Sequence, residues 1–118
     1  MYHGWSDQLI APMNSINYYS SVVKSLGGEK KASDDVRLFM VPGMAHCGGG
    51  EGPNDFDKVA AIQQWVEQGK APETMIASHS DKGAVDRSRP LCVYPKVAKY
   101  KGAGSMDDAA NFTCALPQ

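Results

Sequence analysis

The chain has 118 residues, of which 42% are hydrophobic and 21% are charged, values that are ordinary for a globular protein. Its 12 basic and 13 acidic residues give a formal net charge of −1 and are spread along the chain. No basic patch is present that would bind a nucleic acid, and no apolar run approaches the ~18–20 residues of a membrane span. We therefore expect neither a nucleic-acid partner nor a membrane partner.

The first elements alternate between strand and helix signals. Residues 1–4 read as the end of a strand that begins upstream of Met1. A helix is expected to start at Pro12, because proline suits the first turn, and to end at Gly27-Gly28. Apolar residues recur at helical spacing within it, namely Ile16, Tyr19, Val23 and Leu26.

The middle of the chain repeats this order. The apolar run 36–41, closed by a proline-glycine turn, is typical of a buried parallel strand. A glycine-rich loop follows, and Asn54 is expected to cap the next helix with Asp57 three residues on. That helix should end at Gly69 and present one apolar face, made of Val59, Ile62, Trp65 and Val66.

The last third is harder to interpret. Residues 74–77 predict one more strand, and periodicity fades from Ser78, although residues 87–93 and 97–100 suit short extended pieces. Alternating strands and helices predict an α/β fold with a parallel sheet. We expect one incomplete domain over residues 1–118, with a strand-helix-strand-helix-strand portion at 1–77 and an irregular tail at 78–118.

Two strand ends carry an ionisable side chain. Asp7 follows the first strand, and His46 follows the turn after the second. A carboxylate and an imidazole in this chain order match the acid and base of an α/β-hydrolase triad. Taken alone, Asp7 is better explained as a capping or solvated turn residue, and His46 as a surface residue. Their matching contexts favour a catalytic pair.

The nucleophile of such a triad is missing from this sequence. No Gly-x-Ser-x-Gly elbow occurs, and the triad order places the serine upstream of Met1. We expect His3 to pack or form structural hydrogen bonds and His79 to lie in an exposed turn. Trp5, beside the acid, is a candidate for lining the substrate cleft, although packing in the core is the stronger interpretation.

The cysteine count is odd, with Cys47, Cys92 and Cys114, which leaves one thiol over or points to a partner outside the chain. Cys92 and Cys114 would close a loop in a glycine- and serine-rich tail, which suits an oxidising compartment. A zinc site is the competing interpretation, but no Cys-x-x-Cys or paired histidine spacing supports it. The acidic loop before the second helix lacks the alternating oxygen ligands of a calcium site, and Asn111-Phe112-Thr113 fits the glycosylation pattern. We expect no metal and no cofactor in this segment.

The motifs taken together resemble the tannase and feruloyl esterase family over nearly the whole chain. The matching stretches are His3–Ile10, Pro42–Cys47, Arg89–Pro95, Tyr100–Gly102 and Ala109–Cys114. The resemblance implies the carboxyl-terminal part of an α/β-hydrolase fold and a secreted or periplasmic location. It also implies hydrolysis of esters of aromatic acids such as ferulate or gallate.

The resemblance also assigns roles to individual residues. It implies that Asp7 is the triad acid and His46 the base, and that Cys92 and Cys114 form a disulfide in the tail. It gives Cys47 a partner cysteine next to the nucleophilic serine, which lies outside this chain. It places a lid domain, with the calcium site of the family, upstream of this segment.

We therefore expect the carboxyl-terminal segment of a serine carboxylic-ester hydrolase, inactive by itself because the serine is absent. Its expected partners are a small aromatic ester and the missing amino-terminal portion of the hydrolase. One alternative is a non-catalytic fragment that self-associates or pairs with an amino-terminal partner. Another is a small metal-dependent hydrolase built on His46 and the acidic loop.

Overall fold

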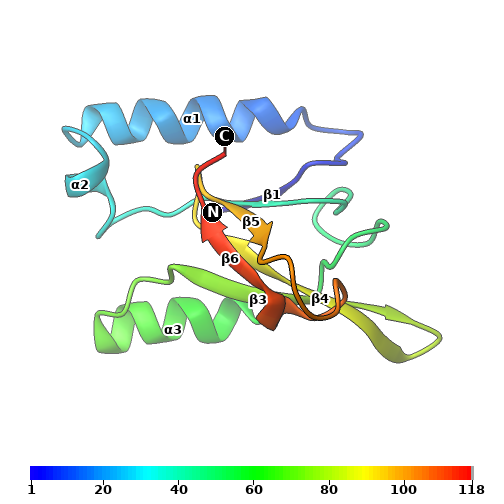
Figure 1. Cartoon of the computed structure of the whole chain (residues 1–118). Coiled ribbons are helices and arrows are strands. Elements are labelled where there is room, and N and C mark those ends of the chain that lie inside the picture. Colours follow the sequence, from blue (N-terminus) through cyan, green and yellow to red (C-terminus); the bar gives the residue numbers. More distant parts are fainter. Residues whose placement is uncertain (118) are drawn as a thin grey trace.

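The computed structural model describes residues 1–117, in which the strands form a central layer between two helices (Figure 1). Helix α1 (Pro12–Ser25) lies on one side of the strands and helix α3 (Lys58–Gln68) on the other (Figure 1). The short helix α2 (Glu29–Ala32) follows α1 directly. This is the α/β layering that alternating strand and helix signals predict.

The first two strands form the parallel pair that carries the predicted site. Strand β1 (Tyr2–Gly4) runs beside β2 (Phe39–Val41), with Tyr2 opposite Phe39 and Gly4 opposite Val41. Parallel pairing brings the carboxyl ends of both strands to the same edge of the sheet. The loops that hold Asp7 and His46 leave from that edge.

Strand β2 is buried on both faces, as its nearly continuous apolar run predicts. Phe39 and Val41 belong to one core cluster, whereas Leu38 and Met40 belong to a second cluster on the opposite face. The second cluster is completed by helix α1, which buries Ile16 and Tyr19 against it. Alternation along one short strand therefore joins the two halves of the core.

Helix α3 differs from its prediction at its start and on its apolar face. Its N-cap is Asp57, whose carboxylate accepts a hydrogen bond from the backbone N–H of Ala60 at 2.8 Å. Asn54 instead stabilises the preceding loop by accepting a hydrogen bond from the N–H of Gly49. The predicted end is correct, because Gly69 adopts a left-handed conformation there. Trp65 of the predicted apolar face is half-buried, whereas the other three residues are exposed, namely Val59, Ile62 and Val66.

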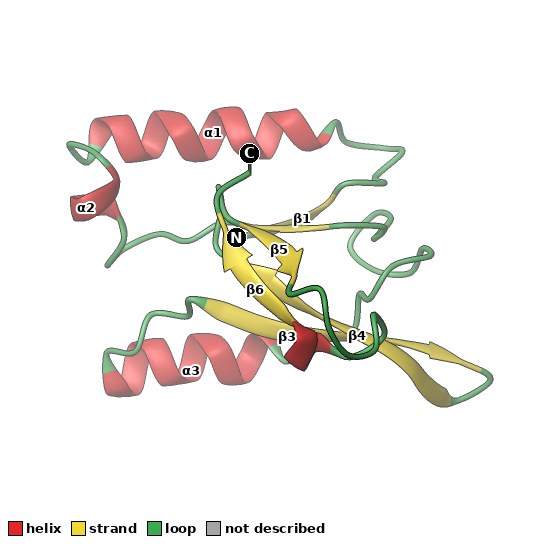
Figure 2. Ribbon diagram, in the orientation of Figure 1, coloured by secondary structure: helices red, strands yellow, loops and turns green. Residues whose placement is uncertain are grey.

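The prediction of an irregular tail is wrong, because much of the tail is strand, and the extended pieces expected at 87–93 and 97–100 overlap two of its strands (Figure 2). The remaining elements are β3 (Thr74–Asp81), β4 (Ala84–Cys92), β5 (Val97–Tyr100), the 3₁₀ turn η1 (Ala109–Asn111) and β6 (Phe112–Ala115). Strands β3 and β4 form an antiparallel hairpin, and β5 and β6 form a second antiparallel pair. Most side chains on the outer part of the hairpin are exposed or half-buried, so the sequence there shows little hydrophobic alternation.

The hairpin attaches to the parallel pair through its carboxyl end. Val93 forms an antiparallel bridge with Phe39, and the N–H of Tyr94 donates to the carbonyl of Leu38 at 2.7 Å. The third strand predicted at 74–77 is real, but it extends to Asp81 and pairs with β4 instead of extending the parallel pair. The predicted boundary between the portions 1–77 and 78–118 lies within β3. The division into these two portions stays a prediction.

Candidate active site

Asp7 lies in the loop between β1 and α1, and backbone hydrogen bonds define its position. The N–H groups of Trp5 and Ser6 donate to the carbonyls of Val41 and Met44, which ties this loop to the end of β2. The Oδ1 atom of Asp7 accepts the backbone N–H groups of Leu9 at 2.8 Å and Ile10 at 3.0 Å.

The side chain of Asp7 is only 4% exposed. It does not cap α1, whose N-cap is Ala11. Asp7 is therefore neither a capping residue nor a solvated one.

His46 comes from the loop after β2 and reaches the other carboxylate oxygen. Its Nδ1 atom lies 2.9 Å from Oδ2 of Asp7, and its side chain is 43% exposed. The loop bends back on itself, because the N–H of Ala45 donates to the carbonyl of Gly49 and that of Gly52 to Gly43. Gly43 has a φ of +74°, which glycine adopts without strain. The structure thus brings together the two residues that the sequence analysis paired.

The environment of Asp7 keeps its carboxyl group ionised. The N–H of Ile10 is the main cause that holds the pKa of Asp7 far below its ordinary value, and the hydrogen bonds from His46 and Leu9 add to it. Burial acts in the opposite direction but is outweighed. Because a carboxylate can only accept, Nδ1 of His46 donates the hydrogen of this contact, and in a neutral ring Nε2 is then the nitrogen without a hydrogen.

His3, which was expected to pack or form structural hydrogen bonds, also lies beside Asp7. Its Nε2 atom lies 3.0 Å from the same Oδ2 oxygen of Asp7 and 3.2 Å from the carbonyl of Ile10. Its Nδ1 atom lies 2.7 Å from the hydroxyl of Ser15 in α1. The expected structural hydrogen bonds are confirmed by the contacts with Ser15 and Ile10, and Nε2 also lies beside the carboxylate of Asp7. The four-residue spacing of His3 and Asp7 around a turn was the signal that could have indicated this contact.

Trp5 is not a core residue. Its side chain is 44% exposed and lines a mostly apolar groove of about 740 Å³. The groove runs between α1, the end of β2 and the strands of the tail, and its other lining residues include Met13, Met40, Pro90, Tyr94 and Phe112. The interpretation of Trp5 as core packing is wrong, and a substrate-facing role stays a prediction.

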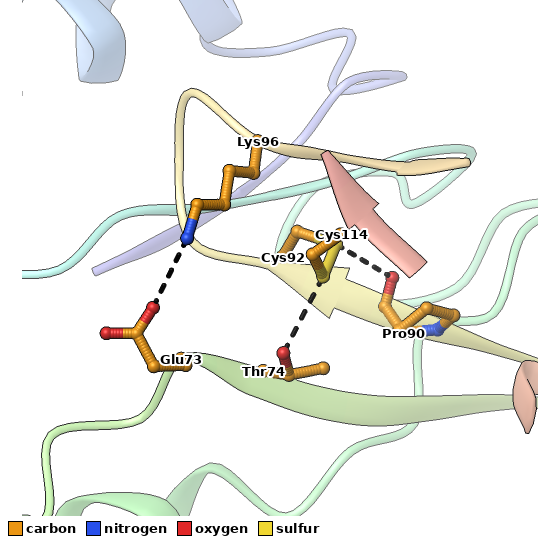
Figure 3. Close-up of a disulfide and its surroundings, with 6 residues drawn as sticks. All are labelled: Glu73, Thr74, Pro90, Cys92, Lys96 and Cys114. Carbon is orange, nitrogen blue, oxygen red and sulfur yellow. Dashed lines mark hydrogen bonds and ion pairs between the residues drawn. A yellow bond between two sulfur atoms is a disulfide. The ribbon is translucent and has the colours of Figure 1, made fainter. Parts of the chain in front are cut away.

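The disulfide in the tail is present. Cys92 at the end of β4 is bonded to Cys114 in β6, with 5.6 Å between the Cα atoms and a sequence separation of 22 (Figure 3). The hydroxyl of Thr74 in β3 lies 3.6 Å from the sulfur of Cys114 (Figure 3). The bond therefore joins the two antiparallel pairs. Cys47, next to His46, is a free and exposed thiol with a φ of +61°.

His79 does not lie in an exposed turn as expected. It is part of β3, where the side chain is 20% exposed, and its Nδ1 atom lies 2.6 Å from Oδ1 of Asp86 in β4. Each hairpin strand supplies one member of this second histidine–aspartate pair. A β-bulge separates His79 from Ser80 at this position.

Within residues 1–117, no three histidine, cysteine or acidic side chains converge as metal ligands would. The acidic loop and His46 therefore do not form a ligand set in the described part of the chain. In the same range, no helix is both long and apolar enough to cross a membrane.

The fold and the site together define a class of protein. A carboxylate and an imidazole at the carboxyl ends of adjacent parallel strands, in that chain order, are arranged like the acid and base of α/β-hydrolase esterases. Comparison with known proteins identifies the family within this class. Residues 1–115 match the family model described as tannase and feruloyl esterase, and the chain belongs to this family.

The relatives that this chain resembles include an ester hydrolase and a feruloyl esterase that are much longer than this chain. It is 41% identical over 120 residues to the mono(2-hydroxyethyl) terephthalate hydrolase of Piscinibacter sakaiensis, which covers 99% of this chain and 19% of that protein. It is 41% identical over 118 residues to a probable feruloyl esterase of Arthroderma benhamiae, covering 97% of this chain and 22% of the relative. The chain thus spans about a fifth of the length of these curated relatives.

The fold comparison agrees with the family assignment. The crystal structure of an esterase from Aspergillus oryzae matches with a TM-score of 0.87 at 34% identity, covering 97% of this chain and 26% of that one. The homologues are esterases and hydrolases, which supports a carboxylic ester hydrolase family for this chain.

Proposed function

We propose that this chain is the acid- and base-bearing segment of a serine carboxylic-ester hydrolase that acts on esters of aromatic acids. The single observation that carries the proposal is the 2.9 Å contact between Nδ1 of His46 and Oδ2 of Asp7. The buried, ionised Asp7 orients the imidazole and stabilises the imidazolium formed during the reaction. The nucleophilic serine is supplied by residues upstream in chain order, as the order of the triad requires.

The proposed reaction has two steps, with His46 transferring the proton in each. As the serine oxygen bonds to the ester carbonyl carbon, Nε2 of His46 takes the proton of the serine hydroxyl. The bond to the alcohol then breaks, and Nε2 returns this proton to the departing oxygen, which leaves an acyl-enzyme. A water molecule attacks the acyl group with the same proton transfers, releasing the acid and restoring the serine.

The aromatic substrate class is supported by two separate observations. The relatives named above are a terephthalate mono-ester hydrolase and a probable feruloyl esterase, and both names refer to aromatic acids. In this chain, exposed Trp5 follows β1 two residues before Asp7 and lines the apolar groove. An aromatic face beside the acid offers a surface for stacking with such an acyl group.

The cysteines support export of the complete protein. The disulfide between Cys92 and Cys114 suits a secreted or periplasmic location, because thiols in the cytosol are kept reduced. Cys47 is free and exposed next to His46, where a cysteine beside the upstream serine could reach it. We propose that pairing as the role of Cys47.

A non-catalytic fragment that pairs with an amino-terminal partner is the second candidate function. It is favoured by the apolar groove and by the exposed apolar side chains of α3, which leave much apolar surface in contact with water. Because the relatives are about five times longer than this chain, the occupant that fits this surface is the upstream portion of the same hydrolase. Self-association of the isolated chain would cover the same apolar surface.

A chimaera tests the catalytic proposal. In this chimaera, the present chain replaces the matching segment of the Piscinibacter sakaiensis relative and is joined to the upstream part of that protein. We expect the chimaera to hydrolyse aryl esters and the Asp7→Asn variant to lose on the order of 10⁴-fold in kcat. The isolated chain should show no turnover above its His46→Ala variant. Turnover by the isolated chain, or a fully active Asp7→Asn chimaera, would contradict the proposal.

A further inference from the structure

We propose that His3 is a positioning residue for Asp7, holding the Oδ2 oxygen in place for His46 while being held in turn by Ser15 of helix α1. This inference deepens the proposed function and rests on its assignment of Asp7 as acid and His46 as base. His3 is not a catalytic residue in this proposal, because it acts only through Asp7.

The geometry at Asp7 gives the two oxygens different donors. Oδ1 is held by the backbone N–H groups of Leu9 and Ile10, whereas Oδ2 receives side-chain nitrogens only. Those nitrogens are Nε2 of His3 at 3.0 Å and Nδ1 of His46 at 2.9 Å. The side chain of His46 is 43% exposed and that of His3 is 10% exposed, so His3 is the more enclosed of the two neighbours that can hold Oδ2 in place.

The protonation pattern of His3 follows from its three neighbours. Nε2 faces two acceptors, the carboxylate of Asp7 and the carbonyl of Ile10, and must therefore carry a hydrogen. Nδ1 faces the hydroxyl of Ser15 at 2.7 Å, which can donate to it. A neutral His3 with its hydrogen on Nε2 is compatible with these contacts: it donates to Ile10, lies beside Oδ2 of Asp7, and places no second positive charge beside the imidazolium of His46.

Burial strengthens this arrangement. The side chain of His3 is 10% exposed and that of Asp7 is 4% exposed, so little water competes for the contact between Nε2 of His3 and Oδ2 of Asp7. The link from Ser15 through His3 to Asp7 joins helix α1 to the site across 12 residues of sequence. A triad acid must hold its imidazole in one tautomer and orientation, and a second donor on the same oxygen restricts rotation of the carboxylate.

The tautomer of His46 in the isolated, ¹⁵N-labelled chain tests the proposal without requiring activity. Long-range ¹H–¹⁵N spectra at a pH where the ring is neutral distinguish hydrogen on Nδ1 from hydrogen on Nε2. We expect Nδ1–H to predominate in the wild-type chain, and its share to fall by more than half in His3→Phe. His3→Gln keeps an N–H that can reach Oδ2 and should retain a wild-type share. His79→Phe, at the other histidine–aspartate pair, is the matched control and should change nothing at His46.

Asp7→Asn separates failure of this inference from failure of the proposed function. A His46 tautomer that does not respond to Asp7→Asn would overturn the acid–base pair itself. A response to Asp7→Asn combined with a wild-type share in His3→Phe would overturn the role of His3 alone. Should His3→Phe not fold, as shown by collapsed amide dispersion, Ser15→Ala decides, because it leaves His3 present without its anchor. A partial fall in the Nδ1–H share of Ser15→Ala then supports the inference, and an unchanged share overturns it.

Discussion

Within residues 1–117, the pairs His46–Asp7 and His79–Asp86 have similar distances and opposite surroundings. At the ends of β1 and β2, Asp7 is buried and His46 is the exposed partner, whereas on the β3–β4 hairpin Asp86 is 42% exposed and His79 is the more buried partner. Asp7 also accepts two backbone N–H groups, while the main contact that lowers the pKa of Asp86 is His79 itself. The two pairs therefore consist of the same residue types and differ in which member is the more buried, Asp7 in the first pair and His79 in the second.

This difference shows what makes such a pair useful for catalysis. A general base must reach a substrate, so the imidazole has to be accessible while the carboxylate stays ionised and oriented by groups other than the imidazole. Asp7 and His46 meet both conditions, and they do so across 39 residues of sequence. His79 and Asp86 are seven residues apart on a hairpin, and their contact is what cross-strand neighbours form locally.

The largest expected effect separates the two pairs by activity. In the chimaera described above, His46→Ala should lower kcat by on the order of 10⁴- to 10⁶-fold, because the serine loses its base. His79→Ala should change kcat by less than about threefold, since surface substitutions outside a site have small effects. Steady-state hydrolysis of an aryl ester measures both. Equal losses in the two variants would mean that the comparison between the pairs is mistaken.

Removing the disulfide should weaken the region of the second pair. Replacing Cys92 and Cys114 by serine should lower the free energy of unfolding by about 3 kcal/mol, because a cross-link over 22 residues no longer restrains the unfolded chain. Denaturant titration with and without reductant measures this loss. The tautomer of His46 should stay as in the wild-type chain in the folded fraction. A changed tautomer would show that the two regions are coupled.

Gly4→Ala should disturb the first pair through the backbone. A Cβ atom at Gly4 would clash with the carbonyl oxygen of Met44 and lie 2.5 Å from that of Ala45, and neither backbone group can move away freely. Overpacking of this kind costs about 1–3 kcal/mol of stability and should displace the loop of His46. Gly48→Ala is the matched control, because nothing lies within 4 Å of its Cβ position. Thermal unfolding of both variants makes the comparison.

The smallest expected effect lies in the acid range. Asp7 and Asp86 both have lowered pKa values in the folded state, so each stabilises the fold above the unfolded pKa of about 3.9 and loses this effect as the pH falls. His46→Ala should keep most of the contribution of Asp7, because the N–H of Ile10 is its main cause. His79→Ala should remove most of the contribution of Asp86. The free energy of unfolding of both variants would be measured between pH 5 and 2. An equal loss of its pH dependence in the two variants would contradict the comparison.

Local signals were sufficient to predict the first half of the fold. The proline at the start of α1, the apolar run of β2 and the left-handed Gly69 after α3 each act through the backbone of their own segment. Parallel pairing of β1 and β2 followed from a strand-helix-strand order. The N-cap of α3 was misplaced by three residues, because Asn54 and Asp57 are both good capping residues and only the path of the loop decides between them.

The extended pieces expected at 87–93 and 97–100 overlap β4 and β5, but the full length and the pairing of the tail strands could not be predicted, because these strands bury little on their outer faces. The outer residues of β3 and β4 are polar or exposed on both sides, so no hydrophobic period of two distinguishes them from loop. Their pairing is established by contacts between distant segments, such as Val93 with Phe39 and Cys92 with Cys114. The strand propensity of a short stretch of sequence does not reveal such contacts between distant segments.

The sequence by itself determined the family of this chain, the chain order of Asp7 and His46, and the strands that bring these residues to one edge. These depend on motif residues and on the local rules of strands, turns and helix ends. Tertiary structure decided that Asp7 is buried, that its Oδ2 oxygen is shared by His46 and His3, and that Ser15 supports this arrangement. Burial and hydrogen-bond partners depend on which segments pack together. Helix α1 brings Ser15 to His3, a contact that their separation of 12 residues in the sequence does not predict.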